Sequence, residues 1–202
     1  MSRAATRWQI QWARARGLRV HAETCPQYIA LTADDLRGLN MDFEGAKYVC
    51  SPPPRDEASQ QACWEGLQQG VFSVFSSDHC PFRYDDPQGK LTPKGRTSFR
   101  WVPNGIPGVG ARLPVPFSEG VMKGRIDLER FVAVTATNHA KVYGLYPKKG
   151  AILPGADAAR ERLAPYTAMG HRVLELSLKG RPDESREVLR PLLHGQATLV
   201  LG

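Results

Sequence analysis

The chain has 202 residues, of which 42% are hydrophobic and 23% are charged, so a disordered or fibrous protein is excluded and a globular one is expected. The formal net charge is +7, but the basic residues are scattered without a dense block or an interleaved aromatic motif, which argues against nucleic-acid binding. No apolar run is long enough to span a membrane, and residues 1–8 lack the apolar core of a secretory signal. The four cysteines have no C-x-x-C spacing and are expected to be free thiols in a reducing compartment, which predicts a cytoplasmic location.

The first predicted element is a helix over residues 2–16, ended by Gly17. One face of it is apolar and is expected to pack in the core; it consists of Ala4, Trp8, Trp12 and Ala15. A strand is predicted next over residues 18–24. His21 and Glu23 point to the same side of such a strand, a spacing that can bind metal, but a lone pair favours a structural hydrogen-bonding role.

A second short strand is predicted over residues 47–50, and Ser51 is followed there by three consecutive prolines. Prolines fix an extended backbone and remove N–H donors. The segment is therefore either a rigid connector or a rigid support that presents the backbone groups of Ser51 to a ligand.

A helix capped by Asp56 is predicted to run to Gln69, and a continuous apolar run follows over residues 71–75. Such a run is typical of a strand that is buried on both faces, as in a parallel sheet. It ends in Ser-Ser-Asp-His, which puts the Asp78 carboxylate and the His79 imidazole at the strand's carboxyl end, where α/β proteins collect their chemistry. Asp78 is therefore a candidate metal ligand or proton acceptor; the alternative is that it caps a turn and that His79 is a solvated loop residue.

Residues 83–103 form a long polar segment that can act as a lid, because segments of this length in a compact domain are often functional. A Gly-rich turn over 104–110 follows, without the spacing of a phosphate-binding loop. Three helices and a strand are then predicted, at residues 113–123, 127–135, 140–145 and 151–153. Asp127 and Asn138 are the expected caps of the second and third of these helices.

Several segments together, in order and at matching spacing, are similar to the dihydropyrimidinase and D-hydantoinase family. They are Glu23-Thr24-Cys25-Pro26-Gln27-Tyr28, Lys47-Tyr48-Val49-Cys50-Ser51-Pro52-Pro53, Ser77-Asp78-His79-Cys80-Pro81-Phe82, Pro103-Asn104-Gly105-Ile106-Pro107-Gly108-Val109, Phe117-Ser118-Glu119-Gly120-Val121 and Leu145-Tyr146-Pro147-Lys148-Lys149-Gly150. The resemblance covers about residues 1–158. It is specific because many segments match in order rather than one.

The resemblance implies a cyclic amidohydrolase built on a TIM barrel, with two divalent metal ions, usually zinc, and often a homotetramer. It implies that Asp78 ligates a metal ion and carries a proton from the hydrolytic water to the leaving nitrogen. It also implies that main-chain groups of Ser51 and Asn104 hold the cyclic amide or imide substrate. The product would be an N-carbamoyl amino acid from a dihydropyrimidine or a hydantoin.

Departures from the family limit these expectations. The family's H-x-H pair, its bridging lysine and two further metal-binding histidines have no match in this sequence. The expected fold class is therefore α/β, as a partial TIM barrel over residues 1–150 made of the last strands and helices, with a divergent tail over 151–202 in place of the return to a small β-sandwich. The chain is expected to be a truncated piece that is inactive alone. The alternatives are a noncatalytic scaffold related to dihydropyrimidinase and an inactive remnant of an enzyme gene.

Overall fold

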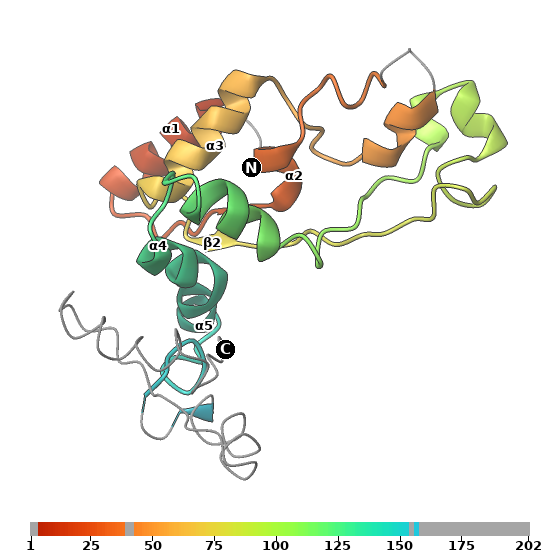
Figure 1. The fold of residues 1–202 in the computed structure, drawn as a ribbon. Coiled ribbons are helices and arrows are strands. Elements are labelled where there is room, and N and C mark those ends of the chain that lie inside the picture. The colour runs from red at the N-terminus through yellow and green to blue at the C-terminus, as the bar shows by residue number, and fades with distance from the viewer. Residues whose placement is uncertain (1–3, 39–42, 154–155, 158–202) are drawn as a thin grey trace, which may run out of the picture. The chain divides into compact units, whose positions relative to one another are not determined.

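The computed structural model describes residues 4–38, 43–153 and 156–157 (Figure 1), so the predicted divergent tail lies almost entirely outside the described residues. The chain divides into two compact units, residues 1–135 and residues 136–202. The domain boundary expected at residue 150 stays a prediction. None of the described helices is long and apolar enough to cross a membrane.

The described elements are mostly short helices. The α-helices are α1 (Ala4–Ala15), α2 (Pro26–Ala30), α3 (Glu57–Gln68), α4 (Leu128–Val132) and α5 (Asn138–Val142). The 3-10 helices are η1 (Phe43–Tyr48), η2 (Pro93–Arg96) and η3 (Phe99–Trp101), and η4 (Pro116–Val121) and η5 (Ala133–Thr137) are π-helices. The strands are β1 (Glu23–Thr24) and β2 (Val74–Phe75).

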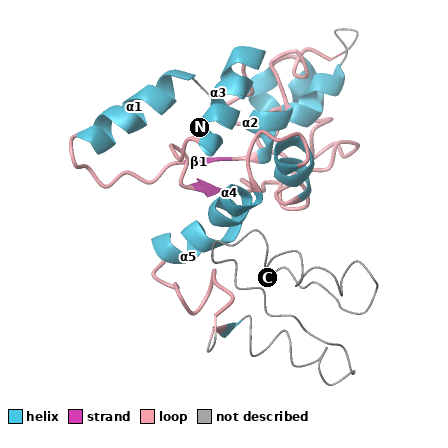
Figure 2. Ribbon diagram, turned by 60° about the vertical axis from the view of Figure 1, so that its left-hand side comes forward, coloured by secondary structure: helices cyan, strands magenta, loops and turns pink. Residues whose placement is uncertain are grey.

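The two strands lie side by side and run parallel (Figure 2), with Glu23 opposite Val74 and Thr24 opposite Phe75. Backbone hydrogen bonds extend the pairing at both ends, from Ser73 N to the Ala22 carbonyl at 2.8 Å and from Ser76 N to the Thr24 carbonyl at 3.1 Å. Because α2 and α3 lie between the strands in sequence, this is the β-α-β connection that parallel pairing requires. The α/β class agrees with the sequence-based expectation, but the described residues form no barrel, which needs eight strands.

Two predicted strands are wrong. Residues 47–50 were expected to be extended, yet Lys47 lies in η1, where a helical turn brings its ammonium to the Glu44 carboxylate as an ion pair. Residues 151–153 have no strand partner among the described residues, and only Ala151 lies in a bend.

Helix starts marked by aspartate are confirmed. The Asp56 side chain accepts a hydrogen bond from Ser59 N at 2.9 Å at the start of α3, and Asp127 accepts one from Arg130 N at 2.6 Å at the start of α4. Asn138 is not a cap, because Thr137 before it already has helical backbone angles.

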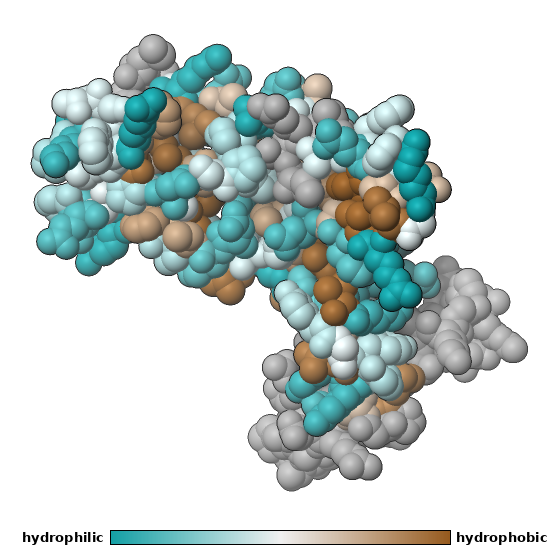
Figure 3. All heavy atoms as spheres, turned by 180° about the vertical axis from the view of Figure 1, so that it is seen from behind, coloured by the Kyte–Doolittle hydropathy of each residue, from teal (hydrophilic) through white to brown (hydrophobic). Residues whose placement is uncertain are grey.

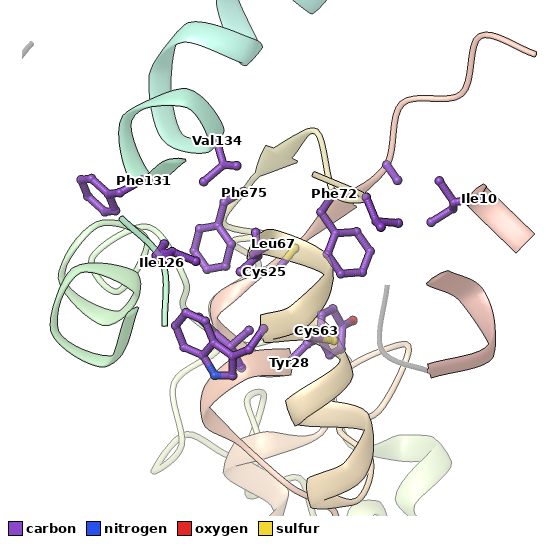
Figure 4. Packing of buried hydrophobic residues seen from close by; sticks show 14 residues of the cluster. Ile10, Cys25, Tyr28, Cys63, Leu67, Phe72, Phe75, Ile126, Phe131 and Val134 are labelled. Carbon is purple, nitrogen blue, oxygen red and sulfur yellow. The ribbon is translucent and has the colours of Figure 1, made fainter. Parts of the chain in front are cut away.

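The core of the first unit joins α1, α2, α3, α4 and β2 (Figure 4). Leu67 and Phe75 are completely buried at its centre, and Phe72 is 1% exposed. The labelled side chains around them come from elements far apart in sequence, from Ile10 in α1 to Val134 in η5. The apolar run over 71–75 is therefore buried as predicted, although the paired part of it is the two residues of β2.

The predicted core face of α1 is wrong. Trp8 and Trp12 are 73% and 49% exposed, whereas Ile10 is buried. The face that meets α3 carries Arg7, which pairs with Glu65, and Arg14, whose guanidinium donates to the Gly70 carbonyl and to Ser73 Oγ. These charge-assisted contacts fix the rotation of α1 and turn the tryptophans outward.

Candidate active site

Asp78 lies three residues beyond β2, in a left-handed backbone conformation with φ of 46°. Aspartate tolerates this region better than most residues. The Asp78 side chain is exposed, and its Oδ2 accepts a hydrogen bond of 2.9 Å from Gln27 Nε2. The carboxylate is thus held at the carboxyl end of the parallel pair, where the sequence predicted it.

Gln27 and Tyr28 reach this position because β1 leads directly into α2, which Pro26 starts. Both side chains are buried, at 2% and 4% exposure. The Tyr28 hydroxyl donates to the Pro52 carbonyl at 3.0 Å, and burial raises the pKa of this phenol, so it remains a donor. The end of β1 is therefore tied both to Asp78 and to the proline segment that follows Ser51.

Ser51 and Asn104 are brought together by backbone contacts beside them. Gly105 N donates to the Val49 carbonyl at 3.0 Å, which joins the two segments directly. The Lys90 ammonium donates to the Val49 carbonyl at 2.9 Å and to the Pro103 carbonyl at 2.6 Å. Ser51 and Asn104 themselves are exposed.

The turn after Asn104 is held against the end of β2 by His79. Its Nδ1 accepts hydrogen bonds from Gly108 N at 3.0 Å and Val109 N at 3.2 Å. His79 and Ile106 also form a parallel backbone bridge. His79 is exposed, as the solvated-loop interpretation required, but its Nδ1 is engaged and so positions the turn.

The predicted residues Asp78, Ser51 and Asn104 thus belong to one connected group of segments. Sequence reasoning did not assign roles to Gln27, Tyr28 or Lys90. Gln27 and Tyr28 lie within a segment that carried the family resemblance, so that segment was the available signal for them. Lys90 had no such signal, because a lysine in a long polar segment is normally solvated.

The donor set at this site does not fit a two-metal centre. The described part of the chain contains no group of three or more His, Cys, Asp and Glu side chains that could hold a metal ion. Asp78 offers a single carboxylate, and the other two candidates, Glu23 in β1 and His21 two residues before it, are exposed. Zinc sites use three or four protein ligands, so these residues alone do not complete one.

The chain is similar in sequence to hydantoinases. It is 46% identical to the D-hydantoinase of Rhizobium radiobacter over 150 residues, which are 74% of this chain and 31% of that protein. It is 42% identical to the D-phenylhydantoinase of Escherichia coli O1:K1 / APEC over 148 residues, which are 73% of this chain and 30% of the relative. No protein-family model matches the chain.

The chain is also similar to solved structures of a dihydropyrimidinase and a D-hydantoinase. The dihydropyrimidinase from Brevibacillus agri NCHU1002 superposes with a TM-score of 0.72 at 43% identity, over 78% of this chain and 33% of that one. The D-hydantoinase from Bacillus sp. AR9 gives a TM-score of 0.73 at 43% identity over the same shares. The chain therefore spans about a third of the length of the relatives it matches.

Proposed function

Because this chain belongs to the D-hydantoinase and dihydropyrimidinase family over its matched residues, we propose that it serves the hydrolysis of the cyclic amide bond of hydantoins or dihydropyrimidines. The product is an N-carbamoyl amino acid. Water adds its oxygen to the ring carbonyl carbon, the C–N bond breaks, and one proton of the water ends on the ring nitrogen.

In this proposal Asp78 is the group that moves the proton. Its carboxylate accepts a proton from the attacking water and delivers it to the leaving nitrogen, so it returns to its starting charge in each cycle. The main-chain groups of Ser51 and Asn104 hold the ring by its polar edge. In the family pattern two metal ions, usually zinc, would supply the activated water, and the role of Asp78 as one of their ligands stays a prediction.

The observation that carries the proposal is the joined group around Asp78. A carboxylate at the end of one parallel strand is held by Gln27 from the neighbouring strand's end, at 2.9 Å. The segments of Ser51 and Asn104 are joined to each other through Val49 and Gly105. This layout supports the proposal, because in α/β enzymes ligands bind outside the carboxyl ends of strands.

The same layout supports the proposal that β1 and β2 are neighbouring strands of a barrel in the longer relatives. A cytoplasmic location and a homotetramer also remain predictions from the resemblance. The 202-residue chain is proposed to be inactive alone, because its described residues offer no complete metal-ligand group.

A chimera tests the proposed activity. The 150 matched residues of this chain replace the corresponding residues of the R. radiobacter D-hydantoinase, and ring opening of hydantoin and dihydrouracil is followed by loss of ultraviolet absorbance. The chimera is expected to hydrolyse at least one of the two rings. Replacing Asp78 by Ala in it should lower kcat by a factor of about 10² to 10⁴, the usual contribution of a general acid–base group.

The control is Asp85→Ala, which removes an exposed carboxylate seven residues further along the chain. It should leave kcat unchanged. A folded chimera with no hydrolysis of either ring, or an Asp78→Ala chimera with nearly full activity, would contradict the proposed role.

A further inference from the structure

Lys90 is the one charged side chain among the described residues that is fully buried, at 2% exposure. Burial of an ammonium is unfavourable unless it is hydrogen-bonded. Loss of solvent lowers the pKa of Lys90, but its Nζ has two carbonyl acceptors, and the ring centroid of Phe82 lies 5.6 Å away. A buried cation with dedicated partners implies a specific role.

The local backbone directs Lys90 inward. Lys90 N donates to the Arg83 carbonyl at 2.9 Å, and Leu91 N donates to the Tyr84 carbonyl at 3.1 Å, so the segment closes on itself. Gly89 makes the closure possible, because a Cβ at this position would lie 2.1 Å from the Arg83 carbonyl oxygen. The backbone at the start of the long polar segment therefore holds the Lys90 side chain in its inward orientation.

The two carbonyls that Lys90 holds stand next to the proposed ring-binding groups. Pro103 shares its peptide unit with Asn104, so an ammonium on the Pro103 oxygen polarises the Asn104 N–H through the same amide. The Val49 carbonyl lies two residues before Ser51 and also accepts from Gly105 N. One cation therefore sets the spacing of both segments and strengthens one donor.

We propose that Lys90 is a positioning residue for substrate binding. It holds the Val49 and Pro103 carbonyls so that the backbone groups of Ser51 and Asn104 meet the polar edge of a cyclic amide or imide, and it makes the Asn104 N–H a stronger donor to a ring carbonyl. This inference rests on the proposed function, because it concerns the same ring.

The first test uses the whole 202-residue chain, labelled with ¹⁵N, and titrates it with hydantoin and with dihydrouracil. The wild-type chain is expected to show saturable shifts of the Ser51, Asn104 and Gly105 amide signals. Lys90→Met keeps the apolar stem but removes the charge, and it should weaken ring binding by a factor on the order of ten. Lys90→Arg should restore part of this loss because it returns a cationic donor.

Lys94→Met is the matched control, since Lys94 is an exposed lysine on the same segment. It should bind the rings like the wild type. Equal ring affinity of the wild-type and Lys90→Met chains, with unchanged Ser51 and Asn104 signals, would overturn the proposal, because a carbonyl-holding role predicts a change at both.

The second test needs no variant and so does not depend on Lys90→Met folding. In the wild-type chain, a scalar coupling across the hydrogen bonds should link Lys90 ¹⁵Nζ to the carbonyl carbons of Val49 and Pro103. If the Lys90 ammonium signal is resolved and exchanges slowly with water, but neither coupling is seen, the inference is overturned. If the couplings are present and no ring titrates the wild-type chain, the ring-binding part of the proposed function fails, and Lys90 is reduced to a structural clamp.

Discussion

Two buried thiols flank the site residues. Cys25 is 3% exposed at the start of α2, and Cys50 is 6% exposed just before Ser51. Burial raises the pKa of each thiol from the ordinary 9.0 to about 11, and in Cys25 a contact of 3.1 Å with Ser76 Oγ offsets part of the effect. Both side chains are therefore neutral, packed groups across the physiological range.

Differential alkylation tests this. At pH 8 iodoacetamide should modify the exposed Cys80 rapidly and leave Cys25 and Cys50 almost unmodified, because the reagent attacks thiolates that it can reach. Peptide mass spectrometry gives the rate at each cysteine, and the urea-unfolded chain is the control, in which all should react. Alkylation of Cys25 in the folded chain at the rate of Cys80 would contradict the assigned burial.

The same pKa shifts set a pH dependence of stability. Because the folded-state pKa is raised, the contribution of these thiols to the free energy of unfolding is complete below about pH 9 and is lost as the pH rises through about 11. Urea unfolding at pH 8 and at pH 10.5 should therefore show lower stability at the higher pH. Replacing Cys25 and Cys50 by Ala should reduce this difference between the two pH values.

At the residue scale, the sequence correctly predicted features that depend on neighbouring residues. The apolar run that ends in Asp78 identified a strand end, and the structure agrees on its place. Gln27 contacts Asp78, which is 51 positions away in the chain, and Lys90 contacts Val49 and Pro103, which are 41 and 13 positions away. No local sequence pattern predicts such contacts. Their partners depend on how distant segments meet.

At the scale of elements, the absence of a side chain at Gly66 lets α3 pack closely against the Phe72 ring, just before β2. A Cβ at Gly66 would lie 2.5 Å from Cε2 of Phe72, whose ring is 1% exposed. Alanine favours a helix over glycine by about 1 kcal/mol, but overpacking a core that cannot shift costs about 1–3 kcal/mol. The clash is the larger effect, because the ring is enclosed on all sides.

Gly66→Ala is therefore expected to lower the free energy of unfolding by up to about 2 kcal/mol, despite its better helix propensity. Urea denaturation followed by circular dichroism measures this. Gly110→Ala is the matched control, since nothing lies within 4 Å of the added Cβ there. A Gly66→Ala chain more stable than the wild type would show that the Phe72 ring can move aside.

The elements divide into those fixed locally and those fixed by distant partners. The aspartates that start α3 and α4 act on backbone amides three residues away, and both were predicted correctly. The strand expected at 47–50 was wrong because the Glu44–Lys47 ion pair accompanies a helical turn, while extended propensity alone is a weak signal. The rotation of α1 depends on the Arg7–Glu65 contact, which spans 58 positions.

At the scale of the molecule, large apolar side chains remain at the surface (Figure 3). The most exposed of them are Trp8, Phe99, Met122 and Tyr143, each above 70%. Scattered apolar residues are normal on any protein.

The described part of the chain offers a metal ion few ligands. Asp78 is one carboxylate, and the part of the chain that the structure describes has no group of three potential ligands. Structural zinc sites with four ligands gain about 10–16 kcal/mol, and a single carboxylate in water gains only a small part of that. The purified 202-residue chain is therefore expected to bind zinc weakly and to show no hydrolysis of hydantoin or dihydrouracil with added zinc.

Calorimetric titration with zinc and the ultraviolet assay of ring opening measure these two properties, and the chimera with the R. radiobacter D-hydantoinase supplies the positive control. Asp78→Ala should remove part of the weak zinc binding, because one oxygen ligand is lost. Robust turnover by the isolated chain would mean that its own residues assemble a complete hydrolytic site. In that case Asp78 would work with ligands other than those of the family pattern, and the proposed division between this chain and the metal centre would be wrong.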